Sequence, residues 1–162
     1  MSSPRPCLFL DRDGVINRNA RRGEYILRWE EVRILPGIID WVRLFRTAGF
    51  LVIVVTNQRG VSLGLHTEAE LQALHDQLAE TFAQAGAPFD AILYCPHGLN
   101  ECQCRKPEPG MIEEACRRFQ IDMARSLLVG DSNLDEQLAA NCGLAFVRVA
   151  DGAVVAVTPA GA

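Results

Sequence analysis

The chain has 162 residues, enough for one compact domain, and 49% of them are hydrophobic, enough for a substantial core. Lys and Arg number 16 against 20 Asp and Glu, which gives a formal net charge of −4. This balance attracts no polyanion in general, and no basic run supplies a local patch, so we expect neither nucleic acid nor a membrane as a partner. The longest apolar run, residues 50–55, is too short to span a bilayer.

The first six residues lack the charged, then apolar, then small-residue order of a secretory signal. We therefore expect a cytoplasmic protein, in which the six cysteines would stay reduced or bind metal rather than form disulfides. Three of the cysteines cluster within residues 95–104. The other three, Cys7, Cys116 and Cys142, stand in apolar contexts, and we expect them to be buried without a function of their own.

Short apolar runs alternate with helical patterns along the whole chain. In chain order, strands are predicted at 7–10, 50–55, 91–94, 126–129 and 145–149, and helices at 36–48, 67–85, 111–119 and 134–141. Thr67 and Glu70 have the spacing of a capping box. The pattern predicts a single α/β domain over 1–162, a Rossmann-like three-layer sandwich with a parallel sheet. The tail from 151 to 162 carries no clear pattern.

Polar residues follow four of the predicted strands. Asp11 and Asp13 follow the first, Thr56 the second, Cys95 the third and Asp131 the fourth. Because ligands of open α/β sheets bind beyond the carboxyl ends of the strands, these side chains are expected at one edge.

Each acidic segment taken alone has an ordinary structural explanation. The Asp13-Gly14 pair resembles a simple turn, and Asp131 or Ser132 resembles a helix cap. Together, however, the acids would repel one another by about 4 kcal/mol for each pair about 4 Å apart, at an effective dielectric near 20. They therefore require a counter-cation, and carboxylate oxygens suit Mg²⁺. The single lysine, Lys106, lies between the third and fourth strands and is expected to approach the same edge.

A second metal site is predicted in the loop at 95–104. Cys95, His97, Cys102 and Cys104 form a C-x-H-x4-C-x-C pattern, a complete tetrahedral set for Zn²⁺. The alternative is a loop with free thiols and a surface histidine. A complete set leaves no position for water, so the zinc would be structural. Lys106 follows two residues after the last ligand, and we hypothesise that the zinc preorganises it.

The segments FLDRDGVIN, VVTNQ, CRKP and VGDSNLD resemble, in order, the four motifs of the haloacid dehalogenase superfamily of phosphohydrolases. The resemblance implies the family's α/β fold without a large cap domain. It makes Asp11 the nucleophile and Asp13 the general acid/base, and it assigns Thr56 and Lys106 to the transferring phosphoryl group. The Mg²⁺ ligands that it implies are Asp11, the backbone carbonyl of Asp13 and Asp131, with Asp135 in support.

General acid catalysis sets a requirement for Asp13. With an ordinary pKa near 3.9, few of its carboxyl groups would be protonated at neutral pH. We expect the neighbouring negative charge to raise this pKa. A reading from another class, a catalytically silent binding module stabilised by zinc, stays open until phosphate release is tested.

The zinc motif joined to CRKPEPGM resembles the heptose 1,7-bisphosphate 7-phosphatase group of this superfamily, with histidinol phosphate or another sugar phosphate as alternative substrates. The chain departs from that group where Arg59 replaces a usual Ser and Ser132 a usual Lys. We expect a monomer, and no site role for His66 and His75, which are interpreted as ordinary surface or helix residues. The residues expected to contact a sugar phosphate substrate are Asn57, Gln58, Arg59 and Arg105.

Overall fold

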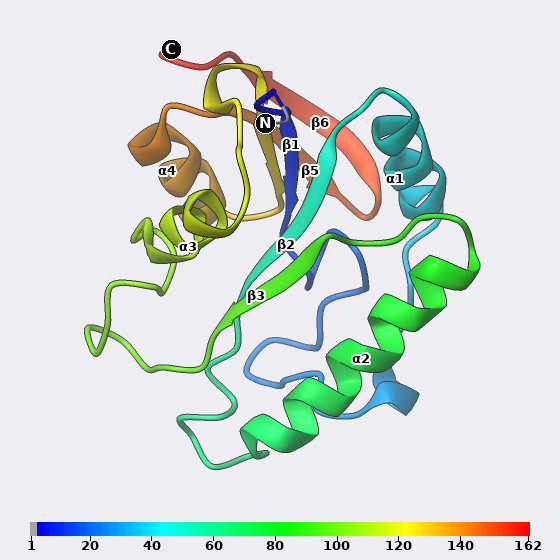
Figure 1. Cartoon of the computed structure of the whole chain (residues 1–162). Helices are drawn as coiled ribbons and strands as arrows, with labels where there is room; N and C mark the ends of the chain where they lie inside the picture. Colours follow the sequence, from blue (N-terminus) through cyan, green and yellow to red (C-terminus); the bar gives the residue numbers. More distant parts are fainter. Residues whose placement is uncertain (1–2) are drawn as a thin grey trace.

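The computed structural model describes residues 3–162, which contain a six-stranded sheet in the order β3-β2-β1-β4-β5-β6 (Figure 1). Neighbouring strands from β3 to β5 are parallel, and β6 pairs antiparallel with β5. The strands are β1 (Cys7–Leu10), β2 (Leu51–Asn57), β3 (Ala91–Cys95), β4 (Leu127–Gly130), β5 (Ala145–Ala150) and β6 (Ala153–Thr158).

Helices cover both faces of the sheet, with α1 and α2 on one side and α3 and α4 on the other (Figure 1). The predicted three-layer α/β fold is therefore confirmed. Within residues 3–162, the segment between β1 and α1 consists of loops and the short 3-10 helix η1. The helices are η1 (Trp29–Glu31), α1 (Ile38–Thr47), α2 (Glu68–Gln84), α3 (Gly110–Arg118), η2 (Met123–Arg125) and α4 (Asn133–Cys142).

Alternation along the central strand β1 divides the core in two. Cys7 and Phe9 point into the layer shared with α3 and α4, whereas Leu8 and Leu10 point into the layer shared with α1 and α2. All four side chains are completely buried. A strand buried on both faces needs apolar residues at every position, which explains the uninterrupted apolar run.

The predicted element boundaries agree with the structure to within two residues. The capping box is present at the start of α2, where Thr67 Oγ1 accepts from Glu70 N at 3.1 Å and the Glu70 carboxylate accepts from Thr67 N at 2.7 Å. Strand β2 ends two residues later than expected, so Thr56 lies within it. Cys95 is the last residue of β3 rather than the first after it.

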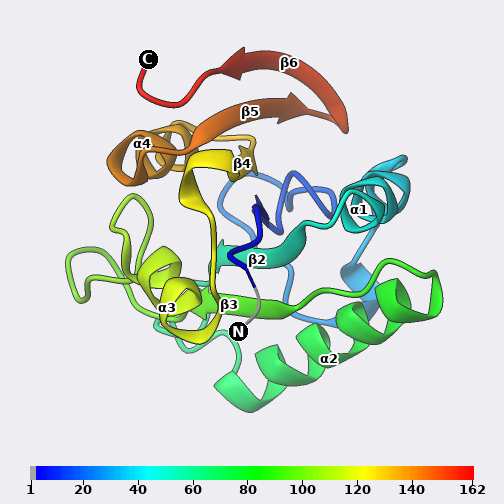
Figure 2. The ribbon, with the colours of Figure 1, turned by 45° about the horizontal axis from the view of Figure 1, so that its top comes forward.

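Strand β6 was not predicted, although the chain contains a signal for it. Asp151 and Gly152 both have positive φ, 49° and 82°, and join β5 to β6 in a tight turn. An Asp-Gly pair between two β-branched runs is typical of such a hairpin. Figure 2 shows β6 beyond β5 at the outer edge of the sheet, where most of its side chains are exposed.

The prediction for the three scattered cysteines is wrong for Cys116. Cys7 is buried and Cys142 half-buried, but Cys116 is exposed on the outer side of α3. The inward side of that helix is taken by Met111, Ile112 and Ala115. None of the helices found between residues 3 and 162 is long and apolar enough to cross a membrane.

The N-cap of α2 gives a first testable prediction. Replacing Thr67 with Ala removes the acceptor for the Glu70 N–H, and we expect the free energy of unfolding to fall by about 1 kcal/mol. Urea denaturation of the parent and the variant measures this difference. Thr67→Ser, which keeps the hydroxyl, is the control and should stay close to the parent. Equal stability of the parent and the Ala variant would contradict the assigned cap.

Candidate active site and metal centre

The site lies where the strand order reverses, between β1 and β4 at their carboxyl ends. Asp11 follows β1, Thr56 lies near the end of β2, and Asp131 follows β4. Lys106 enters from the loop before α3. Four segments that are distant in sequence therefore place polar groups at one edge, as the motif order predicts.

Lys106 is the centre of this arrangement and is only 4% exposed. Its Nζ lies 2.9 Å from Asp11 Oδ1 and 2.7 Å from Asp135 Oδ1, and it donates to the Val55 carbonyl at 3.1 Å. Burial lowers the pKa of this amine, but the two carboxylates outweigh burial and raise the pKa overall. The side chain therefore stays a cation.

The backbone of Lys106 is held as firmly as its side chain. Its N–H donates to Asn57 Oδ1 at 2.9 Å, and Asn57 Nδ2 donates to its carbonyl at 3.3 Å. Both polar ends of Asn57 are thus engaged in positioning Lys106. Substrate contact by Asn57 stays a prediction.

Three carboxylates form a candidate cation site. One oxygen each of Asp11, Asp131 and Asp135 lies within 4.8 Å of the others. Ligand oxygens at opposite corners of an Mg²⁺ octahedron lie about 4.2 Å apart, so the donors fit this ion. Asp135 is fully buried, and its two oxygens already accept from Lys106 and from the Ser132 hydroxyl at 2.8 Å. Asp135 therefore lies deeper in the protein than Asp11 and Asp131, with both oxygens already engaged.

Both outer carboxylates of this cation site are affected by burial. Desolvation raises the pKa of Asp11 well above its usual range, with Lys106 opposing it, and desolvation also raises the pKa of Asp131. A divalent cation bound between them would lower both pKa values.

Two glycines allow these carboxylates to approach the backbone. A Cβ on Gly14 would overlap the carboxylate of Asp131, and its φ of +86° is a conformation that other residues rarely adopt. A Cβ on Gly130 would overlap the side chain of Asp135.

Asp13 differs from the expectation. Its Oδ1 accepts from Asn17 Nδ2 at 2.9 Å, its Oδ2 accepts from Gln58 Nε2 at 3.0 Å, and both oxygens face the guanidinium of Arg12. Burial raises its pKa, but Arg12, Asn17 and Gln58 together lower it below the ordinary value. The expectation of a raised pKa was therefore wrong, because it counted only the neighbouring acids. The carboxylate is turned to these partners, and Asp13 is not among the carboxylates of the candidate cation site.

Beside the carboxylates lies Gln58, which follows β2. Two arginines, Arg59 and Arg105, are adjacent in sequence to Gln58 and Lys106, and their side chains have no ion-pair partner in residues 3–162. Gln58 Nε2 also donates to Thr56 Oγ1 at 2.9 Å and so links it to Asp13. Arg59 and Arg105 are half-buried, and Arg59 Nε and Arg105 Nη1 have no hydrogen-bond partner among residues 3–162. Arg105 and Lys106 line a cavity of about 160 Å³. Buried donors without partners are costly, so a ligand would stabilise them.

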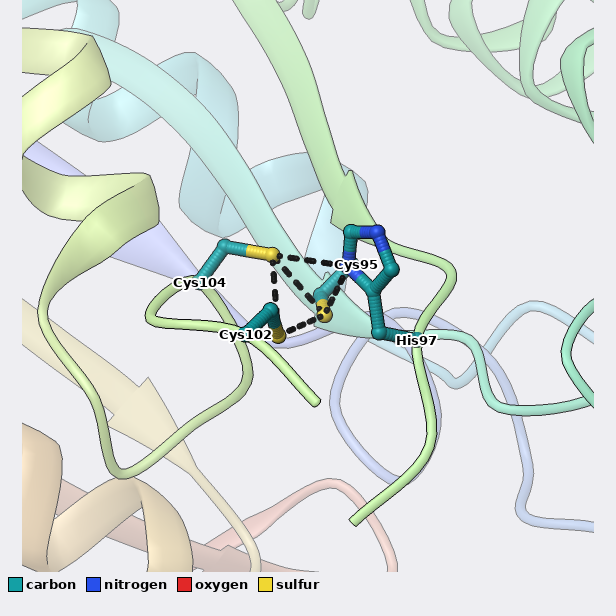
Figure 3. A group of neighbouring side chains, drawn as sticks. All are labelled: Cys95, His97, Cys102 and Cys104. Carbon is teal, nitrogen blue, oxygen red and sulfur yellow. Dashed lines mark hydrogen bonds between the residues drawn. The ribbon is translucent and has the colours of Figure 1, made fainter. Parts of the chain in front are cut away.

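The second cluster is the predicted Cys/His loop (Figure 3). The Cys95 sulfur lies 3.4 Å from that of Cys102 and 3.0 Å from that of Cys104, and His97 Nδ1 is 3.3 Å from Cys104 Sγ. In a tetrahedral site with Zn–S near 2.3 Å, ligand atoms are about 3.8 Å apart. The four donors are thus already gathered at the corners of a small tetrahedron.

One of the thiols in this cluster is also prepared for deprotonation. Burial raises the pKa of Cys102, but the backbone N–H groups of Cys104 and Arg105 outweigh it and bring the pKa to about 7. Burial raises the pKa of the Cys95 and Cys104 thiols, so a zinc ion, which binds thiolates, would have to displace their protons.

Comparison with known proteins agrees with this geometry. The HAD-hydrolase-like family model matches residues 103–157. D-glycero-β-D-manno-heptose-1,7-bisphosphate 7-phosphatase from Rhodopseudomonas palustris is 38% identical, over 91% of this chain and 85% of that protein. D-glycero-α-D-manno-heptose-1,7-bisphosphate 7-phosphatase from Burkholderia mallei, named for the other anomer, is 41% identical over 85% of this chain and 75% of that protein.

Solved structures show the same likeness. D,D-heptose 1,7-bisphosphate phosphatase from B. bronchiseptica, complexed with magnesium and phosphate, is 39% identical and superimposes with a TM-score of 0.82, over 91% of this chain and 83% of that one. The chain is a phosphatase of the haloacid dehalogenase superfamily. A HAD-like phosphatase from Mesorhizobium loti, 31% identical with a TM-score of 0.78 over 95% of this chain and 79% of that one, shares the fold.

Three residues of the phosphatase site were missed from the sequence. Arg12, Asn17 and His75 are each no more than 1% exposed; Arg12 and Asn17 contact Asp13, and His75 contacts Arg12. The interpretation of His66 and His75 as ordinary surface or helix residues is wrong for His66, which is buried and precedes α2. It is right for His75 only in that this residue lies on α2, where it is buried rather than exposed. The sequence contained one local signal for this environment: Arg12 stands between Asp11 and Asp13, and such a spacing allows the arginine to pair with Asp13.

The close approach of Gly130 to Asp135 gives a second prediction. We expect Gly130→Ala to displace Asp135 and with it Lys106, to lower the free energy of unfolding by about 1–3 kcal/mol, and to reduce phosphatase activity strongly. Denaturation and phosphate release measure the two effects. Gly143→Ala, at the far end of α4 with φ +67°, is the control: it should lower stability and leave kcat unchanged. Parent-like kcat in Gly130→Ala would show that this contact does not position Lys106.

Proposed function

We propose that this phosphatase removes the 7-phosphate of D-glycero-D-manno-heptose 1,7-bisphosphate, with Asp11 as the nucleophile. The observation that carries the proposal is the convergence of Asp11, Asp131 and Lys106 at the carboxyl edge of a sheet shared with enzymes of that name. A carboxylate needs no base to act as a nucleophile, and the cation Lys106 offsets its repulsion from an anionic phosphate.

The residues divide the reaction into two steps. In the first, an Asp11 oxygen forms a bond to phosphorus while the bond from phosphorus to the sugar oxygen breaks, and Asp13 gives that oxygen a proton. In the second, Asp13 takes a proton from water, whose oxygen attacks phosphorus and releases phosphate from Asp11. Thr56 and Lys106 hold the phosphoryl oxygens in both steps. The lowered pKa keeps Asp13 ionised, the state in which it can take a proton from water in the second step, whereas the first step requires its protonated form.

We infer a divalent cation, Mg²⁺, at Asp11, Asp131 and the backbone carbonyl of Asp13, with Asp135 behind them. The ion would supply charge neutralisation for the phosphate oxygens. The relative from B. bronchiseptica was solved with magnesium and phosphate. The oxygen donors of this chain fit the same ion.

We infer Zn²⁺ at Cys95, His97, Cys102 and Cys104, in a structural role because the four donors complete its shell. The loop runs directly into Lys106, so its order affects the phosphate-binding cation. Three thiols of this kind suit a reducing compartment, which favours the cytoplasm. A monomer stays our prediction for the oligomeric state.

The second phosphate or the hydroxyls of the sugar would meet Arg105 and Arg59. Both carry a buried donor atom without a partner in residues 3–162. By the resemblance given above, Arg59 replaces a Ser, and it would supply a further cation to an anionic substrate. These two residues are therefore the candidates for substrate selection.

A phosphate-release screen tests the proposed function. We expect the heptose 1,7-bisphosphate to be hydrolysed faster than histidinol phosphate or common hexose phosphates, with Mg²⁺ required. The α and β anomers are assayed separately, because relatives carry both names. Asp11→Asn keeps the shape and removes the nucleophile, so its turnover should be lost. Parent-level turnover in that variant would exclude the nucleophile, and release from no ester would favour a binding module.

Removing the inferred zinc gives a further prediction. We expect kcat to fall about 10-fold with the sheet intact by circular dichroism, as for loss of a second-shell support. Metal content is verified, and Mg²⁺ is restored after chelation. Cys102→Ser should behave like the zinc-free protein, whereas Cys116→Ser, a change on the outer side of α3, should not. Full activity in verified zinc-free protein would refute the coupling to Lys106.

A further inference from the structure

Arg12 is a cation buried inside the protein. Its side chain is 1% exposed and has two neighbours of opposite kind, the carboxylate of Asp13 and the ring of His75. A charge removed from water is costly unless its donors are satisfied. The way in which these two neighbours satisfy Arg12 therefore determines where the guanidinium can lie.

The contacts of Arg12 define the plane of its guanidinium. Nε lies 3.2 Å and Nη2 2.9 Å from Asp13 Oδ1, and Nη2 lies 3.1 Å from Asp13 Oδ2. On the opposite corner, Nη1 lies 3.1 Å from His75 Nε2. Because the guanidinium is rigid and planar, a partner at the far corner restricts the orientation of the side that faces Asp13.

His75 can accept this hydrogen bond because it is neutral. It is 1% exposed on α2, its ring centroid lies 5.6 Å from that of Tyr94, and the other charged or titratable groups near it are Arg12, Asp13 and His66. Burial first, and then the charge of Arg12, lower its pKa to about 3. The Nε2 lone pair therefore stays free to accept from Nη1. The donor and acceptor roles are assigned from this balance.

We propose that His75 is a positioning residue for the phosphatase reaction: as a neutral acceptor it orients the buried Arg12, and Arg12 in turn orients the carboxylate of Asp13. This inference rests on the proposed role of Asp13 as general acid/base. His75 touches neither metal ligand nor phosphate site in the described contacts, and it is 63 residues away from Arg12 in sequence. Helix α2 thereby contributes to catalysis through one side chain.

A purely structural role for His75 would have a different consequence. If His75 served only packing, its substitution would lower the rates of all steps equally, by the fraction of protein that no longer folds. A residue that orients Asp13 affects the steps in which Asp13 moves a proton. Attack of Asp11 on an aryl phosphate expels a weakly basic oxygen that needs little protonation, whereas a sugar phosphate expels a strongly basic one. The two esters therefore separate the two roles.

The experiment measures the single-turnover rate of Asp11 phosphorylation with a sugar phosphate and with p-nitrophenyl phosphate. We expect His75→Leu to slow the sugar ester about 10- to 100-fold, the cost of a misplaced catalytic group, and to leave the aryl ester within about 2-fold of the parent. His75→Gln, which restores an acceptor, should recover most of the sugar ester rate. Thr67→Ala is the control for destabilising the same helix and should show no ester dependence.

Three outcomes would overturn the inference: equal losses on both esters, equal rates in the Leu and Gln variants, or parent-like rates throughout. If His75→Leu does not fold, His75→Met takes its place, since a flexible side chain fills the same space without a comparable acceptor. The variant Asp13→Asn distinguishes failure of the role inferred for His75 from failure of the proposed acid/base role of Asp13. If that variant keeps the parent rate on the sugar ester, the acid/base role itself is wrong. If only that variant loses the rate, His75 is not its positioning partner.

Discussion

A single buried ammonium group holds the catalytic edge together. Lys106 stands between Asp11 and Asp135, at 2.9 Å and 2.7 Å, in a place almost closed to water. Without this cation the carboxylates would face one another at short range, and the loops after β1 and β4 would be driven apart. The rest of the site depends on keeping Lys106 in that position. Its backbone is held by Asn57 at the end of β2, so the strand that carries Thr56 also anchors the lysine.

The parallel sheet explains how residues from distant segments meet around Lys106. Each of the parallel strands β1 to β5 ends at the same edge, and the reversal of strand order leaves room between the loops of β1 and β4. Apolar side chains on both faces of β1 prevent the strand from shifting, since a slip of one residue would move Cys7 and Leu8 into the wrong layers. The rigidity of the core is thereby passed on to Asp11, the residue that follows it.

Local features of this chain and the meeting of the motif residues at one edge were predictable from sequence, whereas other side-chain contacts between distant segments were not. The capping box of Thr67 and Glu70, the strands and the Cys/His set all depend on residues within a few positions of each other. The contact between Arg12 and His75 depends on how α2 packs against the loop after β1, which no local pattern records. The pKa of Asp13 was misjudged for the same reason, because its acidic neighbours are visible in the motif and its buried guanidinium partner was not recognised as one. Strand β6 carried a recognisable Asp-Gly turn, but its run of small residues resembled a tail.

Crowding is unequal on the two sides of this active site. On the metal side, Gly14 lies against Asp131 and Gly130 against Asp135, so almost any new side chain there collides with a carboxylate. Arg59 and Arg105, by contrast, stand in loops, and each has a buried donor atom without a hydrogen-bond partner in residues 3–162. Substitutions of Gly14 and Gly130 are therefore sterically costly, whereas the two arginines meet no such limit within the protein. An exchange of Arg59 or Arg105 would change the charge offered to a ligand without placing a new group against Asp131 or Asp135.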